Sequence, residues 1–210
     1  INFVTSGFNE KAMSIFSKKL LKNIPKINSI VNTINAEKNN TAKGYIKKIY
    51  GHPYIHEKIG NYTFKISPNS FFQTNSYQVK TLYDYIVKSA NLKKNDIVYD
   101  LYCGTGTIGI YVSSIVKKVY GIELIEEAIE DAKFNAKINN ISNIQFYASN
   151  LKDFFNHKKL DIEKPDSIII DPPRPGLHPD VIQNILKLSP LKIVYVSCNP
   201  STQARDVKLF

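Results

Sequence analysis

After Ser67-Pro68 the chain alternates short apolar segments with amphipathic ones, and this alternation constrains the fold more than any other feature of the sequence. The strand-like segments are Ile97–Leu101, Lys118–Glu123, Ile144–Ala148, Ser167–Asp171 and Lys192–Ser197. Because parallel strands need long crossover connections, which helices commonly supply, the pattern predicts βαβ units and a parallel sheet with helices on both faces. Ligands of such sheets bind at the carboxyl ends of the strands, so the residues at those ends are the first candidates for a site.

The first third of the chain has a different pattern. Apolar residues recur at helical spacing from Asn9 to about Asn23, and Pro25 ends that run. Three segments rich in β-branched and aromatic residues then predict the strands of a small antiparallel sheet: Ser29–Ile34, Tyr45–Tyr50 and Tyr62–Ile66. The polar segment 38–43 is expected to be a loop. We therefore predict a partial α+β domain over residues 1–67, a candidate RNA contact, and a separate α/β domain over residues 68–210.

Net charge narrows the class of partner. The 28 Lys and Arg residues outnumber the 18 Asp and Glu residues, which gives a formal charge of +10 and favours a polyanionic partner. A lysine-rich surface that only keeps the chain in solution is the alternative. The chain has no long apolar run and no signal-peptide pattern, so we expect a cytoplasmic protein without membrane contact, and a monomer. It starts with Ile1 rather than Met, which suggests a fragment.

Cysteine and histidine spacing gives no sign of a metal site. The two cysteines, Cys103 and Cys198, lie far apart without a CxxC pairing, which argues against a disulfide scaffold and against a zinc or iron-sulfur site. His52 and His56 are spaced like helical metal ligands, but Pro53 and a strand-like context spoil that presentation. We therefore predict two reduced thiols, a surface histidine pair and no metal.

A glycine turn follows the first strand of the predicted sheet. The glycines that satisfy GxGxxG are Gly104, Gly106 and Gly109. This spacing alone is weak evidence, since it also occurs in dinucleotide-binding turns. Asp100 precedes the turn, where a carboxylate would repel a pyrophosphate but can accept hydrogen bonds from the cationic amino-acid end of S-adenosylmethionine. Glu123 ends the next strand, where a carboxylate can bind both hydroxyls of a ribose. The pattern favours S-adenosylmethionine, with Cys103 as a small filler of the turn.

Two later strand ends carry an acid and a thiol. Asp171 is followed by two prolines, which form a rigid segment poor in hydrogen-bond donors, and it could contact a cofactor or a base. Cys198 follows the last strand among polar and turn residues. A lone cysteine is more often a small buried hydrophobe, but this position favours an accessible thiol whose thiolate Arg174 or Arg205 could stabilise. Asp171 and Cys198 would be laterally adjacent if their strands are neighbours.

A thiolate beside a methyl donor suits one demanding reaction. Carbon 5 of uracil is a poor nucleophile and cannot take a methyl group unassisted. Addition of a thiolate to carbon 6 makes carbon 5 nucleophilic, and a base must later remove the carbon-5 proton so that the cysteine can leave. The sequence offers the nucleophile and a cofactor site, whereas the base is not obvious.

Four motifs occur in order: Ser67-Pro-Asn-Ser-Phe-Phe-Gln-Thr-Asn75, Asp100-Leu-Tyr-Cys-Gly-Thr-Gly-Thr-Ile-Gly109, Asp171-Pro-Pro-Arg-Pro-Gly-Leu177 and Ser197-Cys-Asn-Pro-Ser-Thr-Gln-Ala-Arg-Asp206. Together they resemble the RNA uracil-5 methyltransferases, which make 5-methyluridine in ribosomal and transfer RNA. The resemblance covers nearly the whole chain. It implies a Rossmann-like SAM-dependent methyltransferase sheet preceded by a small α+β domain, and methylation of a uridine, in ribosomal rather than transfer RNA, through a covalent cysteine adduct.

The resemblance also assigns roles to residues. It implies that Cys198 is the nucleophile. It implies a cofactor site formed by Gln73, Asp100, Tyr102, Gly104, Gly106, Glu123, Asn150 and Asp171. Asn150 is the weakest match, to an acid or amide on the adenine side. Without the resemblance, Gln73 would be interpreted as a polar residue near a helix start and Tyr102 as a core aromatic.

The chain departs from this family at its end. Members usually continue past the cysteine motif with further strands and a general-base glutamate, whereas this chain stops at Phe210, so we expect a C-terminally incomplete sheet and poor turnover. An OB-like domain and iron-sulfur cysteines are also missing. Three alternatives stay open: a cytosine-5 RNA methyltransferase, a nicotinamide-dependent oxidoreductase, and a non-catalytic fragment that binds RNA and S-adenosylmethionine, in which Cys198 is inert.

Overall fold

The computed structural model describes residues 1–35, 44–156 and 162–210, so the predicted loop at 38–43 lies outside the described residues. The chain divides into two compact units. The first contains Ile1–Glu57 and Lys65–Ser70, and the second contains Lys58–Phe64 and Phe71–Phe210. Every candidate site residue belongs to the second unit.

The first unit contains a βαβ crossover. Strands β1 (Asn2–Thr5) and β2 (Ser29–Ile34) pair in parallel, and helix α1 (Glu10–Asn23) connects them. The helix begins where the Asn9 side chain accepts a hydrogen bond from the Ala12 N–H at 3.0 Å. Strand β3 (Tyr45–Gly51) pairs antiparallel with β2.

The predicted antiparallel sheet of the first third is therefore wrong in two respects. It lacked β1, because four residues are too few to show a clear alternation, and β1 adds to the sheet in parallel. The segment Tyr62–Ile66, strand β5, pairs instead with β4 (Ile55–Ile59) in a separate two-stranded sheet. The turn between them begins at Gly60, whose φ of 58° suits a tight hairpin, so β5 pairs with the strand immediately before it.

The second unit contains the predicted parallel sheet. Its strands lie in the order β10-β9-β6-β7-β8, and all four neighbouring pairs are parallel. The strands are β6 (Ile97–Leu101), β7 (Lys118–Glu123), β8 (Ile144–Ala148), β9 (Ser167–Ile170) and β10 (Lys192–Tyr195). The predicted strand positions are confirmed, although β9 ends one residue and β10 two residues earlier than predicted.

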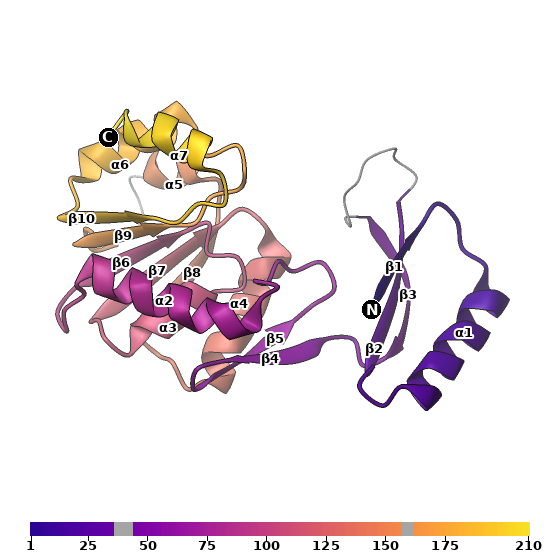
Figure 1. Cartoon of the computed structure of the whole chain (residues 1–210). Helices are drawn as coiled ribbons and strands as arrows, with labels where there is room; N and C mark the ends of the chain where they lie inside the picture. Colours follow the sequence, from indigo (N-terminus) through magenta and orange to yellow (C-terminus); the bar gives the residue numbers. More distant parts are fainter. Residues whose placement is uncertain (36–43, 157–161) are drawn as a thin grey trace. The chain divides into compact units, whose positions relative to one another are not determined.

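Helices cover both faces of this sheet. Figure 1 shows α2 (Ser76–Ala90), α3 (Thr107–Ser113) and α4 (Glu126–Ile138) on one face and α5 (Leu151–Asn156), α6 (Pro179–Leu188) and α7 (Pro200–Val207) on the other. None of the helices in the described ranges is long and apolar enough to cross a membrane.

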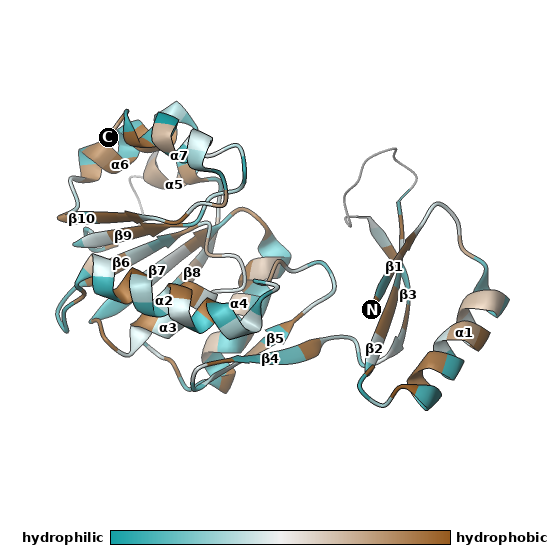
Figure 2. Cartoon of the chain, in the orientation of Figure 1, coloured by the Kyte–Doolittle hydropathy of each residue, from teal (hydrophilic) through white to brown (hydrophobic). Residues whose placement is uncertain are grey.

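Strand residues alternate between two apolar cores. Val98 and Ile169 pack in the core beneath α2, whereas Tyr99 and Ile168 pack in the core beneath α6. Because both faces of β6 and β9 are buried, these two strands are almost continuously apolar. The edge strand β10 is half-buried, and Figure 2 shows it largely in the hydrophobic colour. This double burial fixes the register of the strands, and therefore the positions of the residues at their ends.

Candidate active site

The candidate site lies at the carboxyl edge of the parallel sheet, where β6 and β9 are neighbours. The chain leaves β6 toward β7 and β8 on one side and later adds β9 and β10 on the other, so the topological switch point lies at this edge. Asp100 lies near the end of β6. Asp171 directly follows β9 and donates its backbone N–H to the carbonyl of Leu101 at 3.3 Å. The sheet thus brings together two carboxylates that are 71 positions apart in the sequence.

Asp100 is fully buried and only half satisfied. Its Oδ2 accepts a hydrogen bond from the Gly109 N–H at 2.8 Å, and its Oδ1 has no hydrogen-bond partner among the described residues. Burial, with a smaller contribution from the negative charges of Asp171 and Glu123, raises the pKa of Asp100 to about 8 against the effect of the Gly109 hydrogen bond. A buried carboxyl beside other carboxylates is a place where a cationic ligand is stabilised.

Asp171 is partly buried and contacts the segment before α2. The Gln73 amide nitrogen lies 3.4 Å from Asp171 Oδ2, a long hydrogen bond. Burial raises the pKa of Asp171 to about 6, against the effect of the Gln73 contact. Gln73 and Asp171, predicted together, therefore do meet in the structure.

The two predicted glycines of the turn have different roles. Gly104 and Gly106 both have left-handed backbones, with φ of 52° and 78°. A Cβ on Gly104 would meet no atom within 4 Å, so the space beside it is open to a ligand. A Cβ on Gly106 would lie 2.7 Å from the Phe146 ring and 3.0 Å from Ala132, so this glycine permits close packing of the turn on α4 and β8.

Glu123 and Tyr102 flank the same turn. The Glu123 carboxylate accepts hydrogen bonds from the Gly104 N–H at 3.2 Å and the Ile125 N–H at 3.0 Å, and each of its oxygens keeps a lone pair for a further donor. Tyr102 has a φ of 63°, unusual for a bulky residue, and such strain costs on the order of 1–3 kcal/mol. Burial first, then the charges of Asp206 and Glu123, raises the pKa of Tyr102.

Asn150 has a local structural role that the sequence interpretation did not include. Its side-chain oxygen accepts a hydrogen bond from the Lys152 N–H at 2.9 Å, and its carbonyl accepts one from Phe154, so it caps α5. Asn150 is exposed, two positions after the end of β8, and so lies at the carboxyl edge of the sheet where the candidate site is found. Its predicted contact with a cofactor stays a prediction.

The two cysteines differ as predicted in their exposure. Cys198 is exposed and lies three residues after β10, the neighbour of the strand that leads to Asp171. Cys103 is buried in the glycine turn, and burial raises the pKa of its thiol well above the ordinary value. Cys198 is therefore the thiol that a substrate can reach. The described residues contain no group of three or more His, Cys, Asp or Glu side chains able to hold a metal ion.

Arg205 is bound elsewhere than the sequence suggested. Its guanidinium contacts the Asp206 carboxylate at 2.6 Å and donates a hydrogen bond to the Pro175 carbonyl at 2.9 Å. The sequence offered Arg174 or Arg205 as a residue that could stabilise a Cys198 thiolate; the contacts of the Arg205 guanidinium are with Asp206 and the loop after β9. In the sequence, the only indication of this contact is that Arg205 and Asp206 are adjacent. A single adjacent pair does not show which distant groups the two side chains contact.

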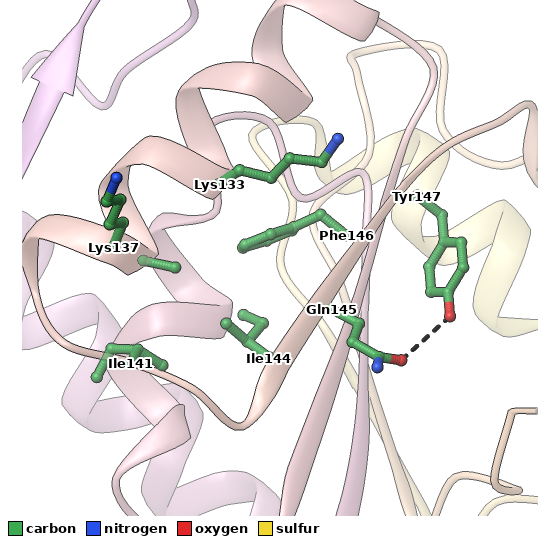
Figure 3. A pocket seen from close by; sticks show the side chains of 8 residues that line it. Lys133, Lys137, Ile141, Ile144, Gln145, Phe146 and Tyr147 are labelled. Atoms are coloured by element: carbon green, nitrogen blue, oxygen red, sulfur yellow. Dashed lines mark hydrogen bonds between the residues drawn. The ribbon is translucent and has the colours of Figure 1, made fainter.

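A separate groove lies between α4 and the outer edge of β8, with a volume of about 540 Å³ (Figure 3). Lys133 and Lys137 line one side of it, and the Tyr147 hydroxyl donates a hydrogen bond to Gln145 at 3.2 Å on the other. The groove contains no carboxylate and no cysteine. It is therefore distinct from the candidate active site.

Comparison with known proteins gives a consistent answer. Residues 9–210 match the tRNA (uracil-5-)-methyltransferase family. A relative from Oceanobacillus iheyensis, described as an uncharacterized RNA methyltransferase, is 45% identical over 206 residues, which are 98% of this chain and 44% of the relative. Another of the same description, from Chlorobaculum tepidum, is 42% identical over 99% of this chain and 44% of its own length.

A solved structure is similar over the whole chain. The tRNA (uracil-54, C5)-methyltransferase of Pyrococcus abyssi, in complex with S-adenosyl-L-homocysteine, has a TM-score of 0.76 and 34% identity, covering 100% of this chain and 49% of that one. The chain thus spans about half the length of the relatives it matches. Since the family match extends from residue 9 to residue 210, this chain belongs to the tRNA (uracil-5-)-methyltransferase family.

Proposed function

We propose that this chain carries the site for S-adenosylmethionine-dependent methylation of carbon 5 of a uridine in RNA. The observation that carries the proposal is the position of Cys198, exposed after β10, beside the strand that leads to Asp171 and at the same sheet edge as the glycine turn. Family membership and the likeness to the P. abyssi enzyme support it.

The residues at the sheet edge fit S-adenosylmethionine. The unpaired Oδ1 of Asp100 and the neighbouring Asp171 form an anionic environment suited to a cationic ligand, and the space beside Gly104 is open. Glu123 keeps lone pairs at the end of β7, where a ribose hydroxyl can donate to them. When bound, S-adenosylmethionine supplies an electrophilic methyl group.

Cys198 has the central chemical role. Its thiolate adds to carbon 6 of the uracil, which places electron density on carbon 5 and makes that carbon nucleophilic. After carbon 5 is methylated, its proton passes to a base, the carbon 5–carbon 6 double bond re-forms, and the thiolate leaves. We propose that Asp171 and Gln73 hold reactants beside the thiol.

We propose ribosomal or transfer RNA as the substrate, with ribosomal RNA as our prediction from the sequence. The formal charge of +10 supports an RNA partner. We also propose that residues 1–67 contact RNA and that residues 68–210 form the methyltransferase domain. In the first unit the Lys47 Nζ lies 5.7 Å from the Phe8 ring and 6.0 Å from the Tyr45 ring, and Tyr45 is 66% exposed, an arrangement suited to stacking on an unpaired base.

A covalent trap tests the proposal. RNA that contains 5-fluorouridine has no carbon-5 proton to lose, so a methylated adduct with cysteine should accumulate and migrate as a complex on a denaturing gel. We expect the chain to form this complex with S-adenosylmethionine and uridine-site RNA, Cys103→Ala to form it too, and Cys198→Ala to form none. Trapping by Cys198→Ala, or RNA binding by the unmodified chain without any trapping, would overturn the assignment. Matched RNAs with uridine or cytidine at the target position separate the uracil reaction from its cytosine counterpart.

A further inference from the structure

One face of α7 is bound to the loop that follows Asp171. The Asn199 amide nitrogen and the Thr202 hydroxyl donate hydrogen bonds to the Arg174 carbonyl at 3.3 and 3.2 Å. One to two turns further along the helix, Arg205 donates to the carbonyls of Pro175 at 2.9 Å and Leu177 at 3.4 Å. These contacts recur at helical spacing, so the helix holds the loop along its whole length.

Asp206 is the buried centre of this contact. Its side chain is fully buried, and its Oδ2 accepts hydrogen bonds from the Leu177 N–H and the Tyr195 hydroxyl, both at 2.7 Å. Its Oδ1 accepts two more from Arg205, at 2.8 and 2.6 Å. Burial alone would raise the pKa of Asp206, but these hydrogen bonds and the charge of Arg205 outweigh it and lower the pKa below its ordinary value. A buried carboxylate with this many donors holds its neighbours in one arrangement.

The loop side of this contact has no room to spare. Gly176 has a φ of 79°, and a Cβ there would clash with Asp206 Oδ2 and lie 2.8 Å from Arg205 Nη2. The helix side leads directly to the thiol, because Asn199, the N-cap of α7, is the residue after Cys198. A shift of α7 against the loop therefore moves Cys198 relative to the Asp-Pro-Pro segment.

We propose that Arg205 and Asp206 form a clamp that fixes the loop 172–177 against the cysteine turn, and that Asp206 is a positioning residue for attack by Cys198. The inference rests on the proposed function for its chemistry. Asp171 itself is held to β6 through its backbone N–H, outside the clamp. The clamp should therefore govern the approach of the thiol to the uracil more than the binding of the cofactor.

Two variants test the clamp from opposite sides. Asp206→Asn removes the charge and places an amide N–H₂ toward groups that are themselves donors, whereas Gly176→Ala forces the loop away without removing any polar group of the clamp. We expect either change to slow trapping of 5-fluorouridine RNA by about ten- to a hundredfold at saturating ligands, as a misplacement on the order of 1 Å does. We expect little change in S-adenosylmethionine affinity, and faster hydrogen exchange at the Leu177 amide.

The double variant gives the sharpest readout. If both changes act through one clamp, the double variant should slow trapping by less than the product of the two single factors. If they act at independent sites, the two factors should multiply. Ser201→Ala, an exposed change on the same helix, should trap at the rate of the unmodified chain. The clamp is refuted if folded, cofactor-binding Asp206→Asn traps at the unmodified rate, or if the two effects multiply. Absence of trapping by the unmodified chain would instead refute the proposed function.

Discussion

The affinity for S-adenosylmethionine should depend steeply on pH, because Asp100 and Asp171 are protonated over part of the neutral range. The pKa values of about 8 for Asp100 and about 6 for Asp171 both lie above the ordinary value for aspartate. A cationic ligand is stabilised by the ionised carboxylates, so its binding must release any proton that they carry. Affinity therefore rises with pH through both values and falls as either group becomes protonated.

The size of the effect follows from the two pKa values. Each carboxyl that must lose a proton lowers the affinity by about tenfold for every pH unit below its pKa, or about 1.4 kcal/mol. Between pH 7 and pH 5 Asp171 alone contributes about tenfold, and Asp100 raises the total toward roughly a thousandfold if it ionises completely on binding. The slope of log affinity against pH should be near one between pH 6 and 8 and steeper below pH 6.

Asp100→Asn isolates the larger contribution. The amide keeps the size of the side chain and an oxygen for the Gly109 N–H, but it has no proton to release. Equilibrium dialysis with labelled S-adenosylmethionine from pH 5 to 8, at constant ionic strength, should show weaker binding by this variant at pH 8 and a nearly flat profile above pH 6. Asp153→Asn, an exposed change of the same charge on α5, serves as the control. An unchanged slope in Asp100→Asn, or a flat profile in the unmodified chain, refutes the reasoning.

Three further predictions concern single side chains around the same sheet edge. Gly106→Ala should lower the free energy of unfolding by about 1–3 kcal/mol in thermal or urea unfolding, because its Cβ would clash with Phe146 and its φ of 78° disfavours alanine. A Cβ at Gly104 meets no protein atom, so Gly104→Ala should reduce the affinity for S-adenosylmethionine, measured by calorimetric titration, by more in kcal/mol than it reduces the free energy of unfolding. An unchanged affinity would contradict the assignment of the space beside Gly104 to the cofactor. Tyr83→Phe removes the 2.7 Å hydrogen bond to the Thr107 hydroxyl at the start of α3 and should cost about 1 kcal/mol of stability.

The parallel sheet could be predicted because its signals are local. Each strand is a short apolar run between amphipathic segments, and double burial requires such runs. The ends of β9 and β10 were placed one and two residues too late, although the Asp171 and Val196 N–H groups just past the strand ends still donate hydrogen bonds to the neighbouring strands. The first unit was less predictable, because parallel pairing of β1 with β2 depends on a crossover by α1 and not on the strand sequences themselves.

The site was predictable to the extent that its residues follow strands. Asp100, Glu123, Asp171 and Cys198 each lie at or just after a strand of the sheet, so the order of strands brings them to one edge. Asp206 could not be found in this way. Besides the adjacent Arg205, its partners are the Leu177 N–H and the Tyr195 hydroxyl, and hydrogen bonds between a side chain and groups distant in the sequence leave no periodic pattern.

The contrast between two buried aspartates explains why one serves structure and the other is suited to a ligand. Asp100 and Asp206 are equally inaccessible, yet their pKa values move in opposite directions. Asp206 accepts hydrogen bonds at both oxygens and lies against a guanidinium, so its charge is fully compensated within the chain. Asp100 accepts one hydrogen bond and faces other carboxylates, so its charge lacks compensation among the described residues. An uncompensated buried carboxylate such as Asp100 suits a site where a cationic ligand neutralises it, and the glycine turn is the place where this ligand would bind.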